Sequence, residues 1–217
     1  MLANAFGELL GLGLTFAAGY AVIAVFGEAQ GTGASLGQFL LMTATGAIEG
    51  SFVGYAQWRA MQPDLARVTR RSWLLATIFG AIVAWFFGSL PFTLINISQD
   101  ASQVPIQEPP QALVLLLAAG MGIVAGAVLS FFQWRVLRRA LPKAGWWIPA
   151  NSLAWMLGLP VIFAATGAIQ PDTPPFQIAL MLALAILLAG ALVGAVHGAF
   201  LVWMVKQTNE IKTQDGQ

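Results

Sequence analysis

The sequence of 217 residues contains no cysteine and one histidine, and only 9% of its residues are charged. Without cysteine, disulfides, thiol chemistry and zinc–thiolate sites are excluded, and a single histidine cannot form a histidine-cluster metal site. A soluble domain usually carries roughly a quarter charged residues. The shortage of charge, together with a hydrophobic fraction of 58%, is difficult to reconcile with a water-solvated surface and indicates an integral membrane protein.

Six segments have the roughly 20 mostly apolar residues that a helix needs to cross the hydrocarbon core of a bilayer. They are 9–26, 36–58, 73–95, 112–134, 147–169 and 178–205. Their apolar residues lie on all sides of the helix, and turn-rich segments at 27–35, 96–111 and 170–176 separate them. The sequence therefore predicts an all-α bundle of six transmembrane helices. We expect a single transmembrane domain over 1–205 and a short polar cytoplasmic tail over 206–217.

The first segment also admits a second interpretation, a cleaved signal peptide, because the residues around Gly27 vaguely resemble a processing site. However, residues 1–8 contain no Lys or Arg, and the apolar stretch is long for such a peptide. We therefore expect it to remain as the first span.

The charged residues are distributed unevenly between the two sets of loops. All ten basic residues follow the even-numbered segments: Arg59, Arg67, Arg70, Arg71, Arg135, Arg138, Arg139, Lys143, Lys206 and Lys212. The opposite loops carry acidic residues only: Glu28, Asp100, Glu108 and Asp172. Because cytoplasmic loops carry the excess of Lys and Arg, both termini are predicted to be cytoplasmic. The expected location is the inner (plasma) membrane or another internal bacterial membrane.

The even-numbered segments resemble one another. They read GAIEGSFVGYAQWR from Gly46, GIVAGAVLSFFQWR from Gly122 and GAVHGAFLVWMVKQ from Gly194. The odd-numbered segments share a shorter aromatic-x-x-glycine pattern that begins at Phe16, Trp85 and Trp155. We therefore predict three parallel two-helix repeats, at about 1–59, 73–135 and 147–205, with approximate threefold symmetry about the membrane normal.

Glycines recur every four residues in the even-numbered segments. They are Gly46, Gly50, Gly54, Gly122, Gly126, Gly190, Gly194 and Gly198. Small residues at this spacing allow transmembrane helices to approach closely. Phosphate-cradling glycine loops follow a strand, and no strand is expected here. We therefore interpret these glycines as helix-packing positions.

Glu49 and His197 are the two ionisable residues that the predicted spans place well inside the hydrocarbon. The repeat aligns both with Ala125, and a rise of 1.5 Å per residue puts both roughly 14 Å from the basic ends of their spans. Ionisable residues at such depth usually face the bundle interior and find a partner. We expect both to face one axial cavity and to interact directly or through water. There they would carry protons, bind a cation or hold a polar ligand group; the alternative is a buried pair that only fixes helix register.

Phe16, Trp85 and Trp155 form a second candidate group, because their positions lie near mid-membrane, where tryptophan is less expected than at the interface. They would line the upper half of the same cavity, and Asn151 in the fifth segment would add a polar group nearby. The alternative is that each aromatic ring fills the space beside a neighbouring glycine.

The segments QWRAM at Gln57 and QWRVLRRALPKAGWWIPANSLAW at Gln133 resemble a pattern of uncharacterised bacterial multi-pass membrane proteins. In that pattern, glycine-rich spans end in Gln-Trp, followed by Leu-Arg-Arg and a Gly-Trp-Trp segment. The resemblance covers the second to fifth spans best. The resemblance implies a membrane topology, but it implies no activity, because none is known for that family.

Several functions remain open. Tight glycine packing and short loops favour a non-enzymatic subunit of a membrane complex or a bundle that binds a small ligand. One alternative is a small transporter or channel that uses Glu49 and His197. Another is a tetrapyrrole-binding protein with His197 as axial ligand; otherwise the cofactor is unknown. No catalytic motif accompanies these residues, so neither an enzyme nor a metal site is expected.

The expected partners are the lipid bilayer and, beyond it, other membrane subunits or a small apolar or polar ligand. Nucleic acid is not expected, because membrane topology accounts for the basic residues.

Overall fold

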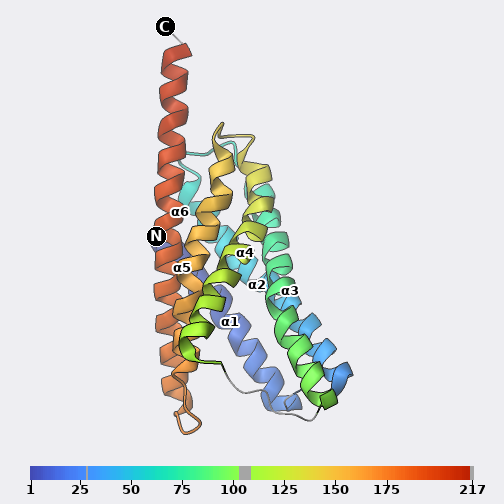
Figure 1. Ribbon diagram of the computed structural model, residues 1–217. Helices are drawn as coiled ribbons and strands as arrows, with labels where there is room; N and C mark the ends of the chain where they lie inside the picture. Colours follow the sequence, from blue (N-terminus) through green and yellow to red (C-terminus); the bar gives the residue numbers. More distant parts are fainter. Residues whose placement is uncertain (28, 103–108, 216–217) are drawn as a thin grey trace.

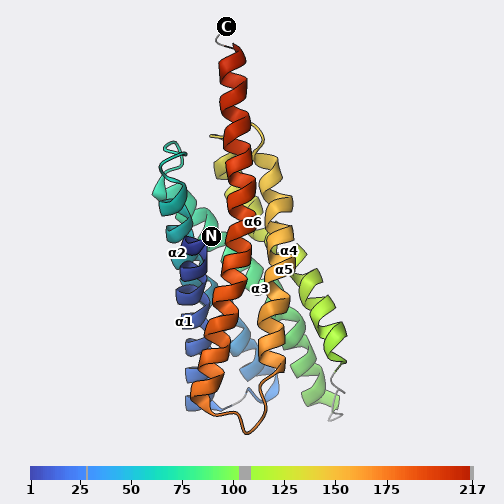
Figure 2. The ribbon, with the colours of Figure 1, turned by 90° about the vertical axis from the view of Figure 1, so that its left-hand side faces the viewer.

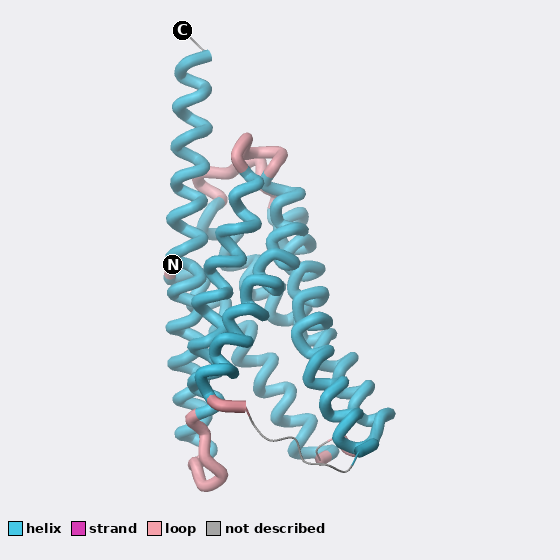
Figure 3. The backbone as a smooth tube through the Cα atoms, in the orientation of Figure 1, coloured by secondary structure: helices cyan, strands magenta, loops and turns pink. Residues whose placement is uncertain are grey.

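The computed structural model describes residues 1–27, 29–102 and 109–215, and these residues contain no strand. They form α1 (Leu2–Phe26), α2 (Gly31–Met61), α3 (Arg70–Ser102), α4 (Gln111–Leu137), α5 (Trp147–Gly167) and α6 (Pro175–Asp215), with a short 3-10 turn, η1 (Ala144–Trp146), before α5. Figures 1 and 3 show these long helices running along one common direction. The prediction of an all-α bundle is confirmed for this part of the chain.

Five of the six helices are long and apolar enough to cross a membrane: α1, α3, α4, α5 and α6. These five helices indicate a membrane protein. The sixth predicted span, α2, has the length but is less apolar, because it carries several polar residues between Gln38 and Gln57, including Glu49. Its polar groups need not face lipid, since α2 lies between α1 and α3 in the bundle.

Several helix boundaries differ from the sequence prediction, and the differences are largest at three of them. The first helix begins at Leu2 rather than at residue 9. The polar residues before that position, Asn4 and Glu8, are buried against other helices, so they need not mark the membrane boundary. Helix α3 continues to Ser102, into the segment predicted to be a loop, since the first helix-breaking proline after Asn96 is Pro105. Helix α6 continues to Asp215, where a polar tail was expected.

Consecutive helices pack against one another, and α6 also packs against α1. The order of the helices around the bundle therefore follows their order in the chain and closes into a ring, which Figure 2 shows from a second side. Each two-helix unit (α1–α2, α3–α4, α5–α6) packs against the next. This arrangement is compatible with the predicted repeats, whose symmetry stays a prediction.

One end of the ring holds the α2–α3 and α4–α5 connections, at the top of Figure 1, and α6 extends beyond it. We call it the basic end, because eight Arg and Lys residues lie there, in the two connections and in the helix ends beside them: Arg59, Arg67, Arg70, Arg71, Arg135, Arg138, Arg139 and Lys143. The 168–174 turn with Asp172 lies at the other end. Of the remaining charged residues used to predict topology, Glu28, Glu108 and the side chains of Asp100 and Lys212 lie outside the described residues.

A hydrophobic cluster closes the basic end. Its largest members are almost completely buried: Trp73, Leu137, Trp147 and Met204. The rings of Trp73 and Trp147 meet edge to face with centroids 6.0 Å apart, a favoured arrangement for aromatic pairs. The cluster joins α3, α4, α5 and α6 and fills the centre of the bundle at this end.

Candidate functional site

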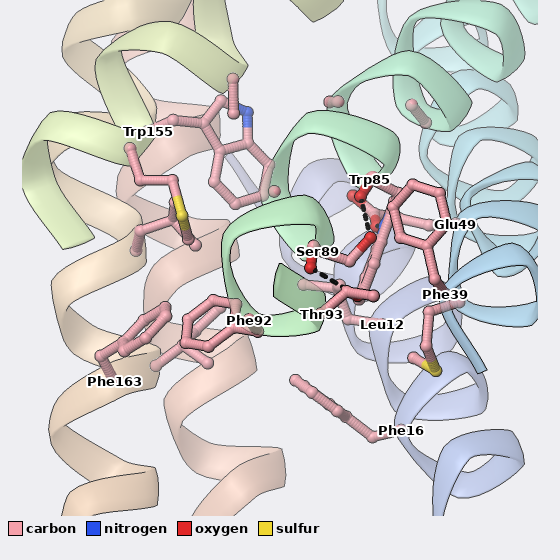
Figure 4. Close-up of a pocket in the computed structure, with 18 of the residues that line it drawn as sticks. Leu12, Phe16, Phe39, Glu49, Trp85, Ser89, Phe92, Thr93, Trp155 and Phe163 are labelled. Atoms are coloured by element: carbon pink, nitrogen blue, oxygen red, sulfur yellow. Dashed lines mark hydrogen bonds between the residues drawn. The ribbon is translucent and has the colours of Figure 1, made fainter. Parts of the chain in front are cut away.

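A cavity of about 330 Å³ lies inside the ring, with walls from α1 to α5. Most of the wall is apolar, and aromatic rings contribute much of it. Figure 4 labels six of these rings: Phe16, Phe39, Trp85, Phe92, Trp155 and Phe163. Phe92 and Phe163 stack with centroids 6.5 Å apart, so they join α3 to α5 across the cavity wall.

Glu49 is the one acidic residue among the described residues that line the cavity, and that lining contains no Lys, Arg or His. Trp85 Nε1 donates a hydrogen bond to Glu49 Oε2 at 2.5 Å, drawn as a dashed line in Figure 4. Two glycines make room for this pair. A Cβ on Gly11 would lie 2.8 Å from Glu49 Cα, and one on Gly46 would lie 2.9 Å from Trp85 Cδ1.

Two of the other polar residues of the lining, Ser89 and Thr93, are occupied by their own helix, whereas Ser35 Oγ has no hydrogen-bond partner among the described residues. Ser89 Oγ donates to the carbonyl of Trp85 at 2.7 Å, and Thr93 Oγ1 donates to that of Ser89 at 3.0 Å. Such bonds to a carbonyl one turn earlier satisfy a hydroxyl inside a helix. Glu49 is the acidic group of the described lining, and it can offer a negative charge to the polar part of a ligand.

The cavity runs along the bundle from Glu49 toward the end opposite the basic end. Its lining includes Ser35, near the start of α2, and Asn96, near the end of α3. In the other direction, the buried cluster around Trp73 and Trp147 fills the bundle.

The structure brings four of the candidate residues predicted from the sequence to one cavity wall: Phe16, Glu49, Trp85 and Trp155. Ala125, which the repeat aligns with Glu49, also lines the cavity. Asn151 does not; it is fully buried, and its Nδ2 donates to the carbonyl of Trp147 at 3.0 Å.

We expected Glu49 and His197 to face one cavity and to interact directly or through water, but His197 does not line the cavity and makes no hydrogen bond to Glu49. Its side chain is 6% exposed and lies against Trp147, with ring centroids 4.9 Å apart. It is absent from the cavity lining, and neither ring nitrogen has a hydrogen-bond partner among the described residues. The partner of Glu49 is instead Trp85.

The reason for this difference is the position of α6 along its own axis. Gly46 of α2 lies against Trp85, near the middle of α3, whereas Gly194 of α6 lies against Met1 and Asn4 at the start of α1. Positions that correspond in the repeat alignment therefore do not share the same packing environment.

Glu8 is a third buried ionisable residue, which the sequence analysis missed. It is 1% exposed, and neither carboxyl oxygen has a hydrogen-bond partner among the described residues. The signal in the sequence is a polar face: Asn4, Glu8 and Thr15 recur at helical spacing, and all three are buried.

A chain of hydrogen bonds, here called the amide layer, lies between the cavity and the basic end. At its centre is Gln133, which is fully buried. Its Oε1 accepts from Trp147 Nε1 at 2.8 Å, and its Nε2 donates to Gln57 Oε1 at 3.1 Å and to Thr77 Oγ1 at 3.0 Å. These bonds join α2, α3, α4 and α5.

The amide layer continues into the two remaining helices. Gln57 Nε2 donates to Asn4 Oδ1 at 2.8 Å, and Asn4 Nδ2 donates to the carbonyl of Gly190 at 3.2 Å. The layer therefore connects all six helices. Both glutamines belong to the Gln-Trp-Arg segments, which the sequence analysis used for topology alone.

The glycines expected at helix contacts differ in their surroundings. Gly46, Gly50 and Gly54 lie against α3, Gly122 and Gly126 lie against α5, and Gly190 and Gly194 lie against α1. The closest approach is at Gly122, where a Cβ would lie 2.2 Å from the carbonyl oxygen of Trp155. Gly198 differs from the expectation, because a Cβ there would meet nothing within 4 Å.

The fold and the cavity define a helical membrane bundle with an internal, mainly aromatic site. Comparison with models of known families, with curated proteins and with solved structures finds no match to this chain. Function is therefore argued from the site itself, since a fold alone does not determine function.

Proposed function

We propose that this protein is a non-enzymatic intramembrane binding protein for a small, largely apolar ligand with one polar group. One observation carries the proposal: an aromatic cavity of about 330 Å³ whose lining holds a single carboxyl group, that of Glu49. Small-molecule sites are typically cavities of about 300–1,000 Å³, mostly apolar, with a few placed polar groups.

Glu49 is suited to hold the polar group of such a ligand. An ionisable side chain inside the bilayer is costly, so its presence there is by default a functional hypothesis. Trp85 alone among the described residues hydrogen-bonds to the Glu49 carboxyl, and it does so at one oxygen. The second oxygen is left for a ligand. The indole fixes the orientation of the carboxyl group, which lowers the entropic cost of binding.

Transport through the bundle is a weaker candidate. A channel would need a polar route from Glu49 to the basic end, but the amide layer and the cluster around Trp73 and Leu137 fill that route. Tetrapyrrole binding through His197 draws no support from the geometry either, because His197 lies outside the cavity lining.

We also propose the finer topology that the sequence predicts: three parallel two-helix repeats with approximate threefold symmetry and both termini in the cytoplasm. The packing of α2 glycines on α3, of α4 glycines on α5 and of α6 glycines on α1 supports the repeats. The gathering of Arg and Lys at one end supports the orientation. Membership of the uncharacterised family of multi-pass membrane proteins rests on the Gln-Trp, Leu-Arg-Arg and Gly-Trp-Trp segments. A role as a complex subunit is compatible with the binding site.

The experiment is mass spectrometry of small molecules retained by protein gently purified from its membrane. Ala125→Phe places a ring in the cavity, whereas Val124→Phe adds the same ring at the neighbouring position, which is 57% exposed. We expect a retained molecule in the wild type and in Val124→Phe and its loss in Ala125→Phe. Equal retention by all three proteins would place the ligand elsewhere.

A further inference from the structure

Two carboxyl groups lie on neighbouring helices: Glu49 in the cavity wall, and Glu8 on α1, one turn before Gly11, which packs against Glu49. Glu49 lines the cavity, and Glu8 is one turn from Leu12, which also lines it. Neither oxygen of Glu8 has a hydrogen-bond partner among the described residues, although the side chain is 99% buried, with an exposed fraction of 1%.

No positive side chain compensates this pair among the described residues around it. The elements that pack against α1 are α2 and α6. From α2 the facing ionisable group is Glu49 itself, and from α6 the nearest neighbour of Glu8 is Gly190, where a Cβ would lie 3.0 Å from Glu8 Cβ. Asn4 lies one turn away on α1 and already bonds to Gln57. His197, the ionisable group of α6, packs against Trp147 instead.

A carboxylate in hydrocarbon is unfavourable without a partner, so a cation beside Glu49 would stabilise the ionised form of this side chain. The walls add a second attraction. Phe16, Trp85 and Trp155 present ring systems to the same space (Figure 4), and the faces of aromatic rings attract organic cations, as in the aromatic cages that bind quaternary ammonium groups.

We propose that the cavity selects lipophilic cations: organic ammonium compounds whose charged nitrogen lies beside Glu49 and whose apolar part packs among the aromatic rings. This inference rests on the proposed function, because it names the chemical class of the ligand that the cavity binds.

The experiment compares benzyltrimethylammonium with its uncharged carbon isostere, neopentylbenzene, by equilibrium dialysis against the protein in nanodiscs of zwitterionic lipid. Empty nanodiscs correct for partition into lipid. We expect saturable binding of the cation with an affinity about tenfold or more above that of the isostere, from the combined charge and ring contacts. Glu49→Gln is expected to abolish this preference.

The control is Asp172→Asn, which removes the same charge from an exposed loop residue at the end opposite the basic end and should keep the preference. Saturable binding of both probes with equal affinity by the wild type would overturn the inference and leave the proposed function standing. Saturable binding of neither probe would overturn both. The wild-type comparison decides the inference even where a glutamate variant fails to fold.

Discussion

At the scale of single residues, the central feature is a carboxyl group held by an indole inside a helical bundle. Glu49 receives its hydrogen bond from Trp85 rather than from another charged group. A neutral donor satisfies one carboxyl oxygen without neutralising the side chain. Glu49 therefore keeps both its polarity and a free oxygen inside the cavity, which a tight Glu49–His197 pair would not allow.

Replacing Trp85 by phenylalanine keeps an aromatic ring but removes the N–H group that holds Glu49. We expect a loss of about 1–3 kcal/mol in the free energy of unfolding, because a polar group in the bundle loses its partner. Trp155→Phe is the matched control: it lines the same cavity, and no hydrogen bond of its indole is seen among the described residues. Reversible unfolding in mixed micelles measures both variants. An equal loss in the two would show that the Trp85–Glu49 bond contributes nothing to stability.

At the scale of helices, two kinds of contact hold neighbours together: glycine contacts and the amide layer. The glycines set how close two helices come, and the amides set how they are aligned along their axes. Close packing is the main attraction between helices in a bilayer, because lipid chains are as apolar as the helices themselves. The depth of the cavity residues therefore depends on both.

The tightest glycine contact gives a sharp prediction for α4 and α5. In Gly122→Ala the new Cβ would lie 2.2 Å from the carbonyl oxygen of Trp155, so the two helices must move apart. Overpacking of this kind costs about 1–3 kcal/mol. Gly120→Ala, on the same helix, meets nothing within 4 Å and should be neutral or slightly stabilising. Thermal unfolding of the two variants tests this prediction. Equal midpoint temperatures for Gly122→Ala and Gly120→Ala would contradict the close approach of α4 to α5.

Gln133 is the residue of the amide layer with the most partners. In Gln133→Leu, Trp147, Gln57 and Thr77 each lose a hydrogen bond. Hydrogen bonds between membrane helices average about 0.6 kcal/mol each, so we expect a loss of about 2 kcal/mol in the free energy of unfolding. Gln62→Leu, at an exposed position after α2, is the control and should change stability little. A Gln133→Leu protein as stable as the control would show that the layer does not hold the helices.

At the scale of the whole molecule, the predicted topology places the basic end in the cytoplasm. The natural chain has no cysteine, so single cysteines can be introduced without removing others. Asp64→Cys lies in the α2–α3 connection at the basic end, and Asp172→Cys lies at the other end. We expect a membrane-impermeant maleimide added outside intact cells to label only Asp172→Cys. Labelling of Asp64→Cys alone would reverse the topology.

The sequence predicts the helices well because the length and apolarity of a span are local properties. It also predicts that Phe16, Trp85 and Trp155 share a wall, since the repeat places them at one position of successive odd helices. The depth of His197 could not be predicted, because it depends on how α6 is placed along α1 through the contact of Gly194 with Asn4, which is specific to that pair of helices.

Glu8 could not be assigned from hydropathy alone. A polar residue at the start of an apolar run normally marks the membrane boundary, whereas here Gly190 of a helix far away in the sequence makes room for the side chain. The amide layer likewise depends on contacts between residues as distant as Asn4 and Gly190. Such contacts arise from the closed ring rather than from any single segment.

The most direct test of the binding cavity is an experimental structure of the wild-type protein purified in native lipid, bound to an antibody fragment to increase its size. We expect an open cavity with ordered non-protein density among Phe16, Trp85 and Trp155 and with its polar end at Glu49. A cavity filled by the protein's own side chains, with Glu49 turned toward lipid, would contradict the proposal.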